Sequence, residues 1–235
     1  MAGETLPPLK FVVVTLDSHL AGAIDEAVAM LAPQLPSLDL KIHVAADWPE
    51  NPALLAQCHA DLRSAHIVAV TQCFQDEQVR ALRDVLLEIR DKVDSILVAV
   101  SAPELVRMTR LGKLNMGGAE AKDPKPWSPL GILRKLRGAK QDGRSSGERQ
   151  MTALRALPGI LKFVPGPAQD VRVYLLSIQY WLAGTSENIA NLIRLHVQKY
   201  ADGPRKVLRK AVDAAPPKQY PEVGVWHPDL RADLG

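Results

Sequence analysis

The residues with the clearest chemical potential lie close to the amino terminus, in the run Asp17-Ser18-His19-Leu20-Ala21-Gly22. A neutral imidazole binds metal ions through one ring nitrogen, and a carboxylate bonded to the other nitrogen fixes its orientation. His19 is therefore a candidate metal ligand that Asp17 would orient. The structural alternative is that Asp17 caps the first helix and His19 lies in a surface turn.

Positive charge forms the second candidate feature, because it is concentrated between Arg107 and Arg149. Guanidinium and ammonium groups bind carboxylates and acidic protein surfaces. The alternative is a solvated segment whose charge only aids solubility. The cations that we single out as contacts to a partner or to acidic ligand groups are Arg110, Lys113, Arg134, Lys135 and Arg137.

Composition limits the class of protein. The chain has 235 residues, 47% of them hydrophobic and 23% charged, which is ordinary for a folded globular protein. A net charge of +3 is too small to indicate nucleic-acid binding. Cys58 and Cys73 fit a reducing compartment, and neither a signal peptide nor a transmembrane run is evident. We expect a cytoplasmic protein, with the basic segment available for peripheral membrane contact, and no ATP site, because a Walker motif is lacking.

Short apolar runs alternate with helical patterns through the first part of the chain. Strands are expected at 11–16, 38–45, 66–71 and 96–100, and helices at 21–31, 52–65, 76–93 and from Pro103 onward. Strands that are apolar throughout are buried on both faces, and their alternation with helices indicates a parallel sheet. The predicted fold class is α/β, a flavodoxin-like parallel sheet with strand order 2-1-3-4 and a C-terminal helical extension.

In such sheets ligands bind at the carboxyl ends of the strands. Polar residues and a glycine stand at or just after the predicted ends of three strands. The candidate ligand-binding set is Asp17, Ser18, His19, Gly22, Thr71, Gln72 and Ser101.

Four segments are expected along the chain. Residues 1–111 form the α/β domain, and residues 112–150 form a basic, Gly/Pro-rich insertion or hinge. Residues 151–215 are helical, and residues 216–235 form a junction to a further catalytic body. The aromatic side chains of Tyr174, Tyr180 and Trp181 are expected to pack the helical layer onto the sheet.

Three stretches, FVVVTLDSHLAGAIDEA, QYWLAGTSENIANLI and YPEVGVWHPDL, resemble the N-terminal domain of the large H subunit of magnesium chelatase. The resemblance implies a protein that binds protoporphyrin IX for ATP-dependent magnesium insertion in chlorophyll or bacteriochlorophyll biosynthesis. It implies an AAA+ ATPase subunit, a bridging subunit and the remainder of the H subunit as partners. The insertion residues would lie downstream, so this chain would hold no cofactor and would not be catalytic alone. The basic residues would meet porphyrin propionates or partner subunits.

A second resemblance concerns the run at Asp17 alone. D-x-H-x-x-G is similar to the motif of cobalamin-binding domains, in which the histidine ligates cobalt. This chain departs from that pattern after the third strand, at Thr71-Gln72-Cys73, and after the fourth, where Ser101-Ala102 replaces Gly-Gly. The alternative function is therefore a tetrapyrrole-binding module with His19 as the axial ligand.

Overall fold

A computed structural model describes residues 6–16, 18–117 and 156–218. Its centre is a six-stranded sheet with the order β2-β1-β3-β4-β5-β6, in which β2, β1, β3 and β4 are parallel. The predicted α/β class and the strand order 2-1-3-4 are confirmed. The strands are β1 (Leu9–Thr15), β2 (Leu38–Val44), β3 (Ile67–Thr71), β4 (Ser95–Ala99), β5 (Arg110–Leu111) and β6 (Leu114–Asn115).

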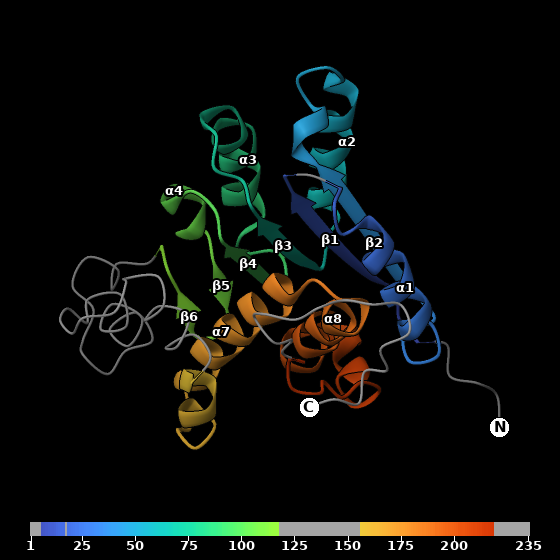
Figure 1. Cartoon of the computed structure of the whole chain (residues 1–235), viewed down its shortest axis with the longest axis vertical. Coiled ribbons are helices and arrows are strands. Elements are labelled where there is room, and N and C mark those ends of the chain that lie inside the picture. Colours follow the sequence, from blue (N-terminus) through green and yellow to red (C-terminus); the bar gives the residue numbers. More distant parts are fainter. Residues whose placement is uncertain (1–5, 17, 118–155, 219–235) are drawn as a thin grey trace, which may run out of the picture.

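Helices cover both faces of this sheet, as Figure 1 shows. One face is covered by α1 (Ala21–Leu31), α7 (Ala168–Ala183) and α8 (Ser186–Tyr200), and the other by α2 (Pro52–Arg63) and α3 (Asp76–Ile89). The short elements are η1 (Ala45–Asp47), α4 (Pro103–Val106) and η3 (Gly203–Lys210), and residues 156–161 are also helical.

The side chains of β1 alternate between the two faces of the sheet, and this explains why the strand is apolar at successive positions. Phe11 and Val13 belong to the hydrophobic cluster beneath α1, α7 and α8, whereas Val12 and Val14 belong to the cluster beneath α2 and α3. Successive side chains of a strand point to opposite faces, so a strand between two helical layers needs apolar residues at every position.

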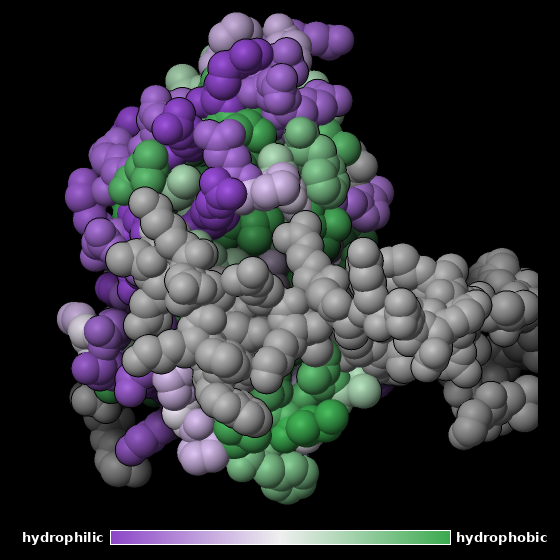
Figure 2. Space-filling model, turned by 90° about the vertical axis from the view of Figure 1, so that its left-hand side faces the viewer, coloured by the Kyte–Doolittle hydropathy of each residue, from purple (hydrophilic) through white to green (hydrophobic). Residues whose placement is uncertain are grey.

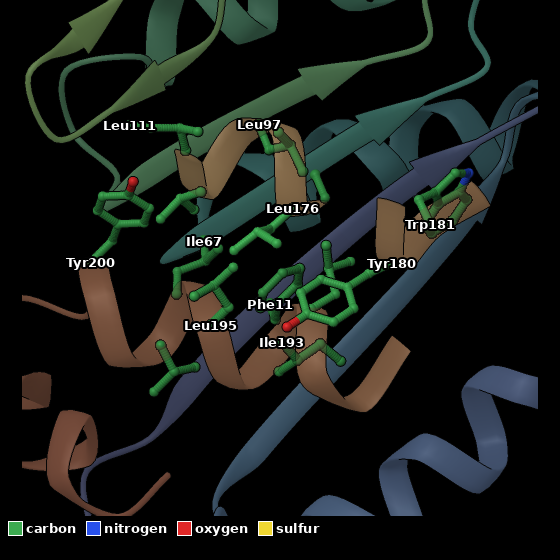
Figure 3. Close-up of a cluster of buried hydrophobic side chains, with 14 of the residues drawn as sticks. Phe11, Ile67, Leu97, Leu111, Leu176, Tyr180, Trp181, Ile193, Leu195 and Tyr200 are labelled. Carbon is green, nitrogen blue, oxygen red and sulfur yellow. The ribbon is translucent and has the colours of Figure 1, made fainter. Parts of the chain in front are cut away.

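The helical layer of α7 and α8 packs directly on the sheet, as Figure 3 shows. Tyr180 and Trp181 are 1% and 5% exposed, so these aromatic residues belong to the core, as the sequence predicts. Helix α7 ends at Gly184, which adopts a left-handed φ of 62°, and the Thr185 side chain then accepts a hydrogen bond from the Asn188 amide to cap α8.

The β5–β6 hairpin is the part of the sheet that the sequence did not predict. Arg110 pairs antiparallel with Ile96 of β4, and Leu111 pairs with Leu114 across a tight turn at Gly112. Each strand has two residues, too few for a periodic pattern. The basic residues Arg134, Lys135 and Arg137 and the predicted junction strand at 220–230 lie outside the described residues.

Apolar side chains are exposed at one end of the molecule. Ile160, Phe163 and Val164 are 63%, 83% and 41% exposed, and Figure 2 shows hydrophobic surface gathered at the lower end, where this segment lies in Figure 1. Within the described ranges, no helix has the length and apolar character needed to cross a membrane.

Asp170, near the start of α7, joins the hairpin to the helical layer. One carboxylate oxygen accepts the Lys113 amide proton at 2.8 Å, and the other accepts the Tyr200 hydroxyl at 3.0 Å. A Cβ atom on Gly112, whose φ is +54°, would lie 2.7 Å from Oδ1 of Asp170. The close approach of backbone and carboxylate therefore requires glycine at this turn.

We predict that Gly112→Ala lowers the free energy of unfolding by about 2–4 kcal/mol, because it adds backbone strain and disrupts the bonds of Asp170. Gly166→Ala is the matched control: its φ is +80° and its Cβ would meet nothing within 4 Å. It should cost only the strain of about 1–2 kcal/mol. Urea unfolding of both variants gives the comparison, and equal losses would contradict the proposed role of Asp170.

Candidate functional site

The carboxyl ends of β1 and β3 flank the point where the strand order reverses. From β1 the chain crosses to β2 on one side, and it returns to β3 on the other. Ligands of open parallel sheets bind at this reversal. Here the Thr15 hydroxyl donates a hydrogen bond to the Gln72 side-chain oxygen at 2.9 Å, so the ends of β1 and β3 are tied together.

Two residues at this end of the sheet hold strained backbone conformations. Gln72 and Val100 have φ values of 60° and 48°, and they directly follow β3 and β4. The Gln72 amide donates to the Val100 carbonyl oxygen at 2.8 Å. A left-handed β-branched residue is rare, and such strain, of about 1–3 kcal/mol, is concentrated at functional sites. The pair therefore marks this end of the sheet as a candidate site.

Ser101 and Thr71 line the same end of the sheet but differ in their bonding. The Ser101 hydroxyl accepts from the Cys73 amide at 3.2 Å and donates to the Ala99 carbonyl oxygen at 3.0 Å, so it holds two loops together. The Thr71 hydroxyl is buried and has no hydrogen-bond partner among the described residues. Among the described residues, Thr71 thus has unused hydrogen-bonding capacity at the end of β3.

Ser18, His19 and Gly22 lie on the exposed loop between β1 and α1 and on the first turn of α1. Helix α1 begins at Ala21, whose amide donates to the Ser18 carbonyl oxygen at 2.9 Å. A Cβ on Gly22 would meet no atom within 4 Å, so the backbone here faces open space. Asp17 lies outside the described residues. The structure thus brings His19 to the solvent-facing carboxyl end of β1.

The candidate cations Arg110 and Lys113 lie at the opposite end of the sheet. Arg110 faces Ile96 near the amino end of β4, whereas Gln72 and Ser101 follow the carboxyl ends of β3 and β4. Strands of five residues span about 16 Å. The predicted residues therefore form two separate groups.

Neither cysteine offers a reactive thiolate in the described structure. Burial raises the pKa of both Cys58 and Cys73 to about 12, so each thiol stays protonated near neutral pH. Among the described residues, no group of three or more His, Cys, Asp or Glu side chains is placed to hold a metal ion.

The sequence pattern could not show which histidines are buried. Burial lowers the pKa of His196 to about 3, and this side chain bonds the Ser177 hydroxyl through Nε2 at 2.9 Å. Burial also lowers the pKa values of His43 and His66. These residues have structural partners: His43 bonds Asp61, and His66 accepts the Lys10 amide.

Asp61 is the centre of a buried polar cluster between α2 and strands β1 and β2. Burial opposes its ionisation, but hydrogen bonds from Lys10 and Gln57 outweigh that effect, so its pKa is lowered. The Lys10 ammonium lies 2.6 Å from one carboxylate oxygen, and His43 Nε2 lies 2.9 Å from the other. Because both carboxylate oxygens are occupied, the cluster fastens α2 to the sheet. The sequence pattern did not predict this cluster, because Lys10, His43 and Asp61 come from three separate elements.

Residues 10–175 match the family model described as "Domain of unknown function (DUF3479)". The chain belongs to the DUF3479 family. This DUF3479 chain is 40% identical over 96% of its length to the H subunit of magnesium chelatase from Rhodobacter capsulatus, and 39% identical over 95% to that of Cereibacter sphaeroides. It is 26% identical over 95% of its length to the chloroplastic ChlH subunit of magnesium chelatase from Oryza sativa subsp. indica.

The resemblance to the N-terminal region of the magnesium chelatase H subunit, inferred from three sequence stretches, is thereby confirmed. The DUF3479 chain spans about a fifth of the length of the curated relatives that it matches, covering 19% and 18% of the two bacterial proteins.

For the candidate site we predict opposite effects of two matched substitutions on adjacent strands. Thr15→Val should lower the free energy of unfolding by about 1 kcal/mol, because Gln72 loses its hydrogen bond. Thr71→Val should leave stability unchanged or raise it, since an unbonded buried hydroxyl is removed. Urea unfolding tests both, and a large loss of stability in Thr71→Val would show that its hydroxyl is bonded in the protein.

Proposed function

We propose that this DUF3479 chain is the N-terminal portion of a magnesium chelatase H subunit, the component that binds protoporphyrin IX for ATP-dependent magnesium insertion. The observation that carries the proposal is 40% identity, extending over 96% of the chain, to the magnesium chelatase H subunit of Rhodobacter capsulatus. An identity spread over the whole α/β unit and its helical extension supports a shared role of both parts.

Within that subunit, the proposed role is to shape porphyrin access or to present a surface to other subunits. The partners would be the remainder of the H subunit, the AAA+ ATPase and the bridging subunit, with porphyrin and magnesium as substrates and ATP used by the partner. In this proposal the insertion residues would lie beyond this region of the H subunit. The proposed location is the cytoplasm, with peripheral contact to a membrane.

We predict that this chain can replace the corresponding region of the Rhodobacter capsulatus H subunit. A chimera carrying residues 1–235 ahead of the remaining body of that protein should form magnesium protoporphyrin with the ATPase and bridging subunits, because the identity extends over 96% of the chain. A truncated H subunit without any N-terminal region is the control. Product fluorescence measures the rate, and a soluble chimera no more active than the truncated protein would contradict the proposal.

A tetrapyrrole-binding module is the second candidate, and the placement of His19 favours it. His19 is exposed on the loop that follows the carboxyl end of β1, next to the reversal in strand order where ligands of such sheets bind. Ser18, Thr71, Gln72 and Ser101 would surround such a ligand. Exposure leaves room for a macrocycle to approach, and neutral imidazole is an axial ligand of metallated tetrapyrroles.

For this module, cobalamin and zinc protoporphyrin should change their visible absorbance when the chain is added, and His19→Ala should abolish the change because it removes the axial ligand. His59→Ala is the matched control, since His59 lies on α2 across the sheet and bonds the Ala81 carbonyl oxygen. Absorbance that does not change, or an equal loss in both variants, would remove this candidate.

A further inference from the structure

A hollow of about 370 Å³ lies at the amino end of the sheet, away from the candidate site described above. It opens between the β5–β6 turn, the start of α7 and the end of α8. The residues whose charges and hydrogen bonds matter in it are Arg110, Lys113, Asp170, Lys199, Tyr200 and Arg209.

The carboxylates around this hollow are already engaged. Asp94 accepts both Nε and Nη2 of Arg205, at 3.1 and 3.0 Å, in a bidentate ion pair. Asp202 lies 2.9 Å from the Lys206 ammonium. Asp170 accepts the Tyr200 hydroxyl and the Lys113 amide, so it is bonded but not neutralised by an ion pair within the described ranges.

The cations that line the hollow are paired with opposite charges less completely than the carboxylates are. Lys113 and Lys199 are exposed, and neither ammonium forms an ion pair within the described part of the chain. Arg110 donates to the carbonyl oxygens of Arg90 and Val93, which satisfy some N–H groups but supply no negative charge. Arg209 donates to the Ala201 carbonyl oxygen at 2.7 Å, and its Nη2 lies 4.0 Å from the Asp202 carboxylate, so this cation is partly neutralised.

The balance of these charges in the hollow is positive. Asp94 and Asp202 are offset by Arg205 and Lys206, which leaves Asp170 as the acidic side chain facing the lining cations. The guanidinium of Arg110 retains unused N–H donors, because two of the five are committed to backbone oxygens. Such a concave, cationic and partly bonded surface suits an anion with several acceptor oxygens.

We propose that this hollow binds a small oxyanion, a molecule whose carboxylate or phosphate group lies between Lys113, Lys199 and Arg110. Its volume is at the lower end of the range for ligand pockets, about 300–1,000 Å³, which fits a small metabolite and not a macrocycle. The site is separated from His19 and the strand-end residues by the length of the sheet. It therefore stands whether or not the chain acts in a chelatase.

The test is an NMR titration of the full chain with inorganic phosphate and, separately, with succinate, in chloride buffer of constant ionic strength. The backbone amides of Lys113 and Asp202 should shift in a saturable way with at least one of the two anions. Saturation by phosphate alone, by succinate alone or by both supports the site and identifies the acidic group that it prefers.

The double variant Lys113→Ala/Lys199→Ala should weaken this binding about tenfold or more, since it removes two unpaired cations. The matched control is Lys41→Ala/Lys210→Ala, which removes the same charge from positions outside the hollow. Amide spectra of both variants report whether the fold is intact. Shifts that never saturate with either anion, or equal weakening in both double variants, would overturn the proposal.

Discussion

The fold depends on covering one face of the sheet that the helices between its parallel strands leave partly exposed. A right-handed crossover to a strand on one side places its helix on one face of the sheet, and a crossover toward the other side places its helix on the opposite face. The step from β1 to β2 therefore puts α1 on one face, and the steps to β3 and β4 put α2 and α3 on the other. The face of α1 would be bare over β3 and β4, where Ile67 and Leu97 need apolar contacts.

Helices α7 and α8 supply that cover from a distant part of the sequence. Leu176, Tyr180 and Leu195 lie against the strands in Figure 3, and the ring of Phe11 meets His196 edge-on at a centroid distance of 6.2 Å. Burial holds His196 neutral, and this lets an imidazole lie in an apolar layer. The helical extension is thus part of the same hydrophobic core as the sheet, even though residues 118–155 separate the two in the chain.

The sequence predicted those features that depend on the pattern of apolar and polar residues within one segment. Apolar strands such as Phe11–Leu16 and the amphipathic stripe of α3 indicated the class and the strand order. The β5–β6 hairpin had one local signal, the turn residues Gly112-Lys113 between two leucines. Its strands have two residues each, which is too short to show the alternation of a strand. Asp170 could not be identified, because its contact with Lys113 joins positions 57 residues apart. The positive φ of Val100 likewise could not be predicted, because a β-branched residue rarely adopts that conformation.

The two ends of the sheet carry different side chains, and separate hydrogen-bond networks hold them in place. At the carboxyl ends, Thr15 bonds Gln72 and Gln72 bonds Val100, and the exposed His19 lies on the loop that follows β1. At the amino ends, the hydrogen bonds of Asp170 connect the hairpin, α7 and α8. The cations of these elements line one hollow. Because these groups are fixed by separate hydrogen-bond networks at opposite strand ends, we expect a substitution at one end to leave the contacts at the other in place.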